Sequence, residues 1–222
     1  MIRFFEKYKW FGVVLLVLSA VIVSAIYSLK TPEVKLPVFQ PNEVNPEMVD
    51  PSIQYVRKYH TISDFKLVNQ NGDTITQKDY DGKIYVADFF FTTCQTICPI
   101  MTDHMVKIQK ALKNDDEVKL LSHTVTPEID DVAQLKKYAL EKGVNDKKWN
   151  LVTGSKKEIY ELARKSYLAT KTTGNGGPYD MIHTENFVLV DKEKRIRGFY
   201  DGTDPKAIEK LLGDIEILEK EK

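Results

Sequence analysis

The sequence predicts an α/β domain with a mixed central sheet and flanking helices, preceded by an N-terminal transmembrane helix. Three observations lead to this prediction. First, residues 11–29 contain no charged side chain. Second, apolar strand patterns alternate with helical patterns between residues 83 and 167. Third, hairpin patterns at 62–76 and 183–202 flank that alternation. Because strands that alternate with helices pair in parallel and hairpin strands pair antiparallel, the sheet should be mixed.

Composition limits the range of functions. The 222 residues include 32 Lys and Arg against 32 Asp and Glu, so the formal net charge is zero. No excess of basic residues points to a nucleic-acid partner. The hydrophobic fraction of 42% is that of an ordinary globular protein.

The N-terminal segment has the length and polarity of a membrane anchor. The run FGVVLLVLSAVIVSAIYSL occupies residues 11–29, close to the roughly 20 residues that span a bilayer. Three basic residues and one acid precede it, so the positive-inside rule places the N-terminus in the cytoplasm and the rest outside, on the periplasmic side. A cleaved signal peptide is the alternative, with VSA at 23–25 as the cleavage site. Both interpretations export the domain.

Proline residues mark the segment that follows. Five of them fall between residues 31 and 59, and proline favours extended backbone. We therefore expect four parts, which are a cytoplasmic basic tip (1–10), a transmembrane anchor (11–29), a Pro-rich tether (30–60) and a folded domain (61–222).

The first half of the domain begins with a hairpin and continues with buried strands and helices. Asn71-Gly72 suits a tight turn within 62–76. The apolar run KIYVADFFF (83–91) is typical of a strand buried on both faces, and VKLLSHTV (118–125) repeats the pattern. Between them, apolar residues recur at helical spacing from Ile97 to Leu112. A second helix is expected at 130–143, where an acidic start is followed by a glycine stop.

The second half adds a short strand (149–154), a helix (155–167), a hairpin and a closing helix (204–218). Ser155 with Glu158 three residues later predicts a capping box. Asp204 before Pro205 predicts an N-cap followed by a proline at the first helical position. A glycine-rich loop at 172–180 should precede the hairpin. This order of elements fits a thioredoxin-like arrangement.

Two cysteines, Cys94 and Cys98, follow the strand at 83–91 directly. Pro99 favours the start of a helix, so both sulfurs should lie at a helix N-terminus, where the dipole lowers thiol pKa values. The pair could form a structural disulfide, exchange thiols or bind a metal. A disulfide would close a very small loop, and thiol exchange usually uses a spacing one residue shorter. Metal binding needs a further ligand.

Four histidines and a methionine are candidates for that ligand. We expect His60 to be solvated in the tether, His104 to lie on a helix surface, and His123 to be a core residue. Met101 fits the core as well. His183 is the strongest candidate, because a thioredoxin-like fold brings its strand beside the strand that leads to the cysteines. Two thiolates and one imidazole favour copper, especially Cu(I), whereas zinc prefers four ligands.

The segments DFFFTTCQTICPIM, TVTPEIDDVAQLKKYA, WNLVTG and HTENFVLVD together resemble the Sco (SenC) family of membrane-anchored copper chaperones. The resemblance spans residues 61–218 and the anchor. It implies a thioredoxin-like fold and a copper site, for Cu(I) or Cu(II), formed by Cys94, Cys98 and His183. Many family members carry His or another polar residue directly before the first cysteine, where this chain has Thr93.

The resemblance also implies a function. It predicts a copper carrier, rather than an enzyme, that delivers copper to the binuclear copper centre of cytochrome c oxidase. The expected partners are the copper-bearing oxidase subunit, other copper chaperones or thiol reductases, and the membrane. A membrane-tethered thiol–disulfide oxidoreductase that acts on oxidase cysteines through Cys94 and Cys98 is the alternative. Pro178 and Asp180 are expected to shape the metal pocket.

Overall fold

The computed structural model describes residues 2–30, 35–171, 174, 177 and 179–221. The chain divides into two compact units, Met1–Val34 and Lys35–Lys222. The first unit contains α1 (Ile2–Lys30). Among the described residues, α1 is the one helix long and apolar enough to cross a membrane, over Tyr8–Ile26, and a signal sequence would show the same pattern.

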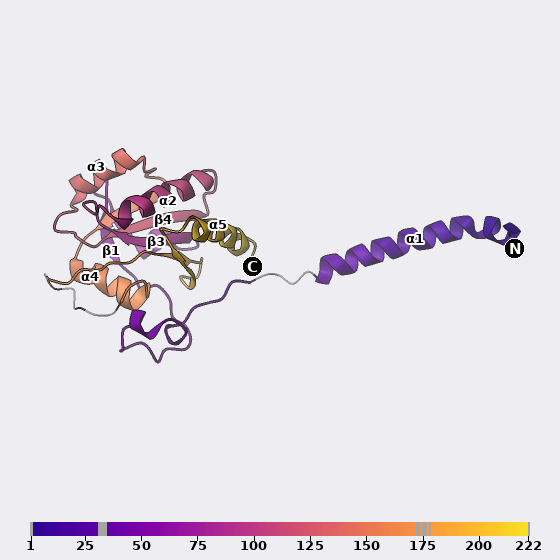
Figure 1. Ribbon diagram of the computed structural model, residues 1–222, viewed down its shortest axis with the longest axis horizontal. Helices are drawn as coiled ribbons and strands as arrows, with labels where there is room; N and C mark the ends of the chain where they lie inside the picture. Colours follow the sequence, from indigo (N-terminus) through magenta and orange to yellow (C-terminus); the bar gives the residue numbers. More distant parts are fainter. Residues whose placement is uncertain (1, 31–34, 172–173, 175–176, 178, 222) are drawn as a thin grey trace. The chain divides into compact units, whose positions relative to one another are not determined.

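The second unit is built on a seven-stranded mixed sheet (Figure 1). The strands are β1 (Lys66–Asn69), β2 (Thr74–Thr76), β3 (Ile84–Phe90), β4 (Val118–Thr124), β5 (Trp149–Thr153), β6 (Asn186–Val190) and β7 (Ile196–Asp201). Their order across the sheet is β2-β1-β5-β4-β3-β6-β7. The central strands β3, β4 and β5 are parallel, and the outer pairs are antiparallel, as the sequence predicts.

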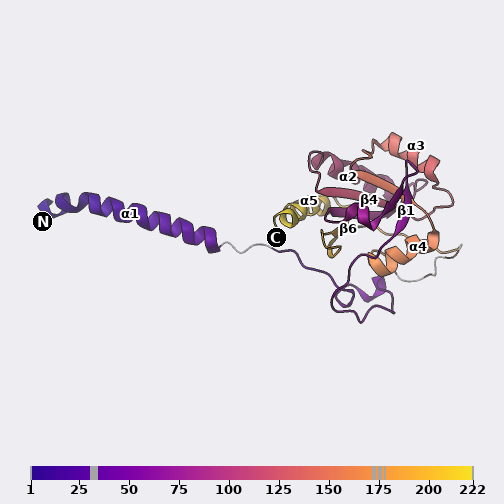
Figure 2. The same cartoon turned by 180° about the vertical axis from the view of Figure 1, so that it is seen from behind.

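Helices cover both faces of the sheet (Figures 1 and 2). One face carries α2 (Ile97–Ala111), α3 (Val132–Lys142) and α5 (Pro205–Lys220), and the other carries α4 (Lys156–Glu161) with the π-helical turn Leu162–Ser166. Every residue of β3 is buried, because apolar layers lie on both sides of it. Short 3-10 helices occur at Pro41–Glu43, Pro46–Met48 and Gln77–Tyr80.

Helix ends follow the sequence signals in two cases and depart from them in a third. Asp204 caps α5 by accepting from the Lys206 amide, with Pro205 at the first position. Gly143 ends α3 in the left-handed conformation, which glycine adopts without strain. The capping box predicted at α4 is absent, because the Glu158 carboxylate instead accepts from the backbone amide of Lys66 at 2.9 Å.

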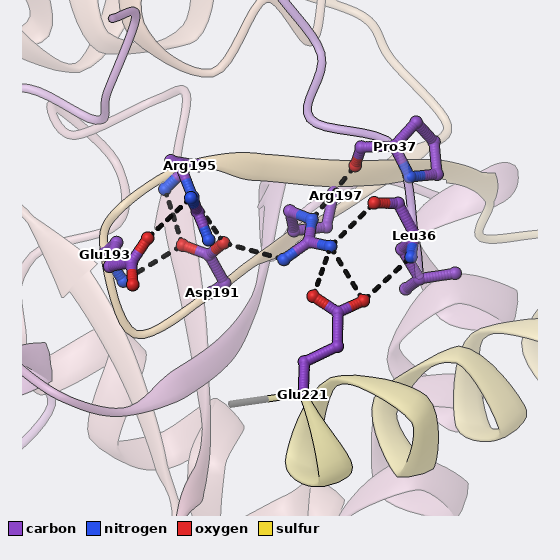
Figure 3. Close-up of polar contacts among 7 residues, drawn as sticks. All are labelled: Leu36, Pro37, Asp191, Glu193, Arg195, Arg197 and Glu221. Atoms are coloured by element: carbon purple, nitrogen blue, oxygen red, sulfur yellow. Dashed lines mark hydrogen bonds and ion pairs between the residues drawn. The ribbon is translucent and has the colours of Figure 1, made fainter. Parts of the chain in front are cut away.

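The segment expected to be a tether packs on the domain from Lys35 onward. Figure 3 shows Arg197 of β7 donating to the carbonyls of Pro37 (2.9 Å) and Leu36 (2.7 Å). The same guanidinium pairs with Asp191 and with Glu221 at the end of α5. Val49 is fully buried in the core. The compact unit therefore begins 26 residues earlier than the boundary expected at Thr61, because a buried arginine and apolar contacts fix this segment.

Candidate functional site

The two cysteines lie where β3 leads into α2. The helix begins at Ile97 with Thr96 as N-cap, so Cys98 is its second residue and Cys94 belongs to the preceding turn. The Cys94 amide donates to the Phe91 carbonyl at 3.3 Å. Both thiols are free, with Cys94 partly exposed and Cys98 buried. The expectation that both sulfurs lie at a helix N-terminus is confirmed.

The two thiols differ in acidity. Burial opposes the ionisation of Cys94, but hydrogen bonds from the Thr96 hydroxyl and amide and from Cys98 outweigh it and lower the Cys94 pKa to about 7. Burial raises the pKa of Cys98 to about 12, and its hydrogen bond to Cys94 adds to the shift. The prediction of a lowered pKa is therefore right for Cys94 and wrong for Cys98, because desolvation outweighs the helix dipole there. The partly exposed Cys94 is therefore the more acidic of the two thiols.

A buried acid that the sequence analysis did not single out lies beneath the pair. Asp88 is in the middle of β3 and is 2% exposed. Burial raises its pKa to about 7, against a hydrogen bond from Ser122 that lowers it. Its Oδ1 has no partner among the described residues. Its field also contributes to the raised pKa of Cys98. The sequence does mark this residue, because Asp88 is the one charged side chain in a strand that is otherwise apolar.

His183 lies beside Phe91, the residue whose carbonyl accepts from the Cys94 amide. It is exposed and precedes β6 by three residues, rather than opening the strand as expected. Its ring stands edge-on to the Phe91 ring, with centroids 5.7 Å apart and planes at 89°. Phe91 therefore contacts two of the three predicted ligand residues. Its carbonyl accepts from the Cys94 amide, and its ring packs against the His183 ring. Within the described ranges, no three His, Cys, Asp or Glu side chains are close enough to share a metal.

A cavity of about 290 Å³ borders His183. Residues from three segments line it, among them Met48, Arg164, Met181 and Thr184. Asp180, expected to shape the metal pocket, pairs through both carboxylate oxygens with Arg164, at 2.6 and 2.7 Å. Pro178 lies outside the described residues.

The other histidines are engaged elsewhere. His60 is half-buried rather than solvated, and its Nε2 lies 2.8 Å from the Ser166 carbonyl. His104 is half-buried, with Nδ1 2.7 Å from the Gly202 carbonyl, instead of lying free on the helix surface. His123 is in the core as expected, stacked on Phe89, and burial lowers its pKa to about 4. Met101 is fully buried, also as expected.

The fold and the site define a class of protein. A mixed sheet with helices on both faces, and a cysteine pair where a central strand enters a helix, make this a thioredoxin-like thiol protein. The SCO1/SenC family model matches residues 54–218, and the chain belongs to that family.

Individual relatives agree with this assignment. The SCO1 protein homolog of Bacillus subtilis (strain 168) is 34% identical over 159 residues, covering 71% of this chain and 82% of the relative. The solved structure of BsSco, a member of the Sco family of cytochrome c oxidase assembly proteins with an identified disulfide switch, is 33% identical. It covers 73% of this chain and 95% of BsSco, with a TM-score of 0.62. Bradyrhizobium japonicum ScoI with copper bound is 27% identical, with a TM-score of 0.55 and coverages of 70% and 99%.

Proposed function

We propose that this protein binds one copper ion through Cys94, Cys98 and His183 and delivers it to the binuclear copper centre of cytochrome c oxidase during assembly. The observation that carries the proposal is the arrangement of soft donors around Phe91. The Phe91 carbonyl accepts from the amide of Cys94, one of the two free thiols, and the His183 ring lies 5.7 Å from the Phe91 ring. The relatives support it, since ScoI of Bradyrhizobium japonicum was solved with copper bound.

The donor set suits copper in either valence. Thiolates are soft ligands that favour Cu(I), and imidazole serves both Cu(I) and Cu(II). Cys94 has a pKa of about 7, so half of it is already thiolate at neutral pH. Cys98 has a pKa of about 12 and would lose its proton when the ion binds, since coordination displaces a thiol proton.

Loading would bring His183 toward the sulfurs. The imidazole is exposed, so a change in its side-chain rotamer would carry it toward the sulfurs. The same freedom favours release. An incoming thiolate or imidazole of the oxidase subunit can replace His183 first and the sulfurs afterwards, so that the ion is never without ligands.

The proposed location follows from α1. An uncleaved helix over Tyr8–Ile26 would hold the domain at the membrane that contains the acceptor. Basic residues before the helix favour a cytoplasmic N-terminus and a domain on the periplasmic side.

Copper titration of the full chain in detergent tests the proposal. We expect one equivalent of copper to bind to the reduced protein, with affinity falling at least tenfold in His183→Ala. His104→Ala is the matched control, because His104 bonds the Gly202 carbonyl and takes no part in the site. No binding by the wild type, or equal binding by His183→Ala, would refute the ligand set.

Thiol–disulfide exchange is a second candidate, favoured by the difference in acidity between the two cysteines. The Cys94 thiolate would attack a substrate disulfide and form a mixed disulfide, which releases one substrate thiolate. Cys98 would then lose its proton and displace the second substrate thiolate, leaving the Cys94–Cys98 disulfide and a reduced substrate. Exchange rates unchanged in His183→Ala, together with an absence of copper binding, would select this function.

A further inference from the structure

Residues 124–130, called the turn below, run from the last residue of β4 to the residue before the N-cap of α3. This turn is connected by hydrogen bonds both to the segment that carries the cysteines and to the segment that carries His183. On the cysteine side, the Asp130 side chain is fully buried and its carboxylate accepts from the Thr92 amide at 3.1 Å and the Thr92 hydroxyl at 2.5 Å. Thr92 precedes Cys94 by two residues. The Thr92 hydroxyl in turn accepts from the Gln134 side chain at 2.9 Å.

Within the turn, the same carboxylate holds the backbone in place. Asp130 also accepts from the hydroxyls of Thr124, at 2.5 Å, and Thr126, at 3.0 Å. Four hydrogen bonds from three threonines therefore converge on one buried carboxylate. Burying a carboxyl group costs free energy that apolar packing would not, so stability alone is a weak reason for an aspartate here.

On the histidine side, the turn is bonded to Tyr160 of α4. The Tyr160 hydroxyl lies 2.9 Å from the Val125 carbonyl and 3.1 Å from the Asp180 carbonyl, and it accepts from the Ile182 amide at 3.4 Å. Ile182 immediately precedes His183. One buried hydroxyl thus joins the turn to the segment that carries the imidazole.

A buried ion pair supports this connection. The carboxylate of Asp180 is held by Arg164, and both side chains are 6% exposed. The Arg164 guanidinium packs over the Tyr160 ring at 5.4 Å. Gly174 lies against the pair, where a Cβ would be 2.3 Å from an Asp180 oxygen. Residues 180–182 are therefore fixed from the side of α4.

We infer that the turn at 124–130 is the frame that sets the separation between Cys94 and His183, with Asp130 and Tyr160 as positioning residues for the copper site. The inference rests on the proposed function. The ligands come from segments more than 80 residues apart, and both segments are bonded to this one turn through a single intermediate side chain. A metal site needs its ligands held at a fixed spacing, and groups behind the ligands supply that constraint.

Tyr160→Phe tests the histidine side, because it removes one oxygen and keeps the ring. We expect copper affinity of the full chain in detergent to fall about 10- to 100-fold, the usual effect of losing a group that orients a ligand. Tyr200→Phe is the matched control, since it deletes another buried hydroxyl, which donates to Asp214 at 2.7 Å on the opposite face of the sheet. Its copper affinity should stay within about twofold of the wild type.

Asp130→Asn and Thr92→Val test the cysteine side, with the same fall in affinity expected. Amide hydrogen exchange of the metal-free protein separates positioning from general destabilisation. Asp130→Asn and Thr92→Val should speed exchange over residues 92–96, and Tyr160→Phe should speed it over residues 180–183. A purely structural role would instead raise exchange throughout the domain.

The outcomes distinguish the inference from the proposed function. If the wild type binds copper and both Tyr160→Phe and Thr92→Val bind it as tightly, the inference is wrong and the proposed function stands. If the wild type binds no copper, the proposed function fails, and with it the assignment of a copper-positioning role. If Asp130→Asn does not fold, the other two variants decide, because each removes a hydroxyl and keeps the shape of the side chain.

Discussion

Replacing Asp88 with asparagine should stabilise the domain in a pH-dependent way. The carboxyl group is buried in β3, one oxygen has no partner among the described residues, and burial raises its pKa from 3.8 to about 7. In the unfolded chain the group ionises near pH 3.8. The neutral carboxyl therefore favours folding fully below pH 3.8, and this contribution is lost as the pH rises toward 7.

The size of the effect follows from the difference between these two pKa values. A gap of about three pH units, at about 1.4 kcal/mol per unit, corresponds to about 4 kcal/mol between pH 3.8 and pH 8. Asparagine has nearly the same shape and does not titrate. We therefore expect the free energy of unfolding of Asp88→Asn, relative to the wild type, to rise by about 4 kcal/mol between pH 4 and pH 8.

Urea denaturation of residues 35–222 at pH 4 and pH 8, reduced and without metal, measures this difference. Comparing variant with wild type at each pH cancels the other titrating groups. Asp64→Asn is the control, because the Asp64 side chain is 88% exposed. A variant whose relative stability is the same at both pH values would show that Asp88 is not buried as an acid, and the reasoning about the Cys98 environment would fail with it.

Three further predictions test other parts of the structure. The rate of alkylation of Cys94 should rise with pH, with a midpoint near pH 7, because about half of this thiol is thiolate there. A midpoint near pH 9 would contradict the hydrogen bonds from Thr96. A domain that starts at Thr61 should melt about 4–8 °C below one that starts at Lys35, because burial of Val49 alone contributes about 2 kcal/mol. Equal melting temperatures would show that residues 35–60 do not pack on the domain. Gly174→Ala should lower the free energy of unfolding by about 1–3 kcal/mol, because φ at this residue is +124° and the added Cβ would meet Asp180. Urea denaturation measures the change, and an unchanged unfolding midpoint would contradict this contact.

Much of the fold could be predicted from the sequence because its signals are local. The fully buried β3 reads as an apolar run, and the start of α5 reads from Asp204 and Pro205. The cysteine pair could be placed at a helix start because Pro99 favours the first turn of a helix.

Other features depend on contacts between distant segments, which spacing does not reveal. The packing of residues 35–60 requires Arg197, about 160 positions later, to bond Leu36 and Pro37. The π-helical turn at Leu162–Ser166 has no marker in the helical pattern. The contact between the His183 and Phe91 rings could not be predicted, because it depends on side-chain packing between segments about 90 residues apart.

X-ray absorption of the copper-loaded chain tests the ligand set most directly. Two sulfur scatterers and one imidazole nitrogen in the first coordination shell are expected, with the imidazole signal lost in His183→Ala and both sulfurs retained. A wild-type spectrum with sulfur alone, or one that His183→Ala leaves unchanged, would contradict the proposal that the histidine joins the two cysteines on copper.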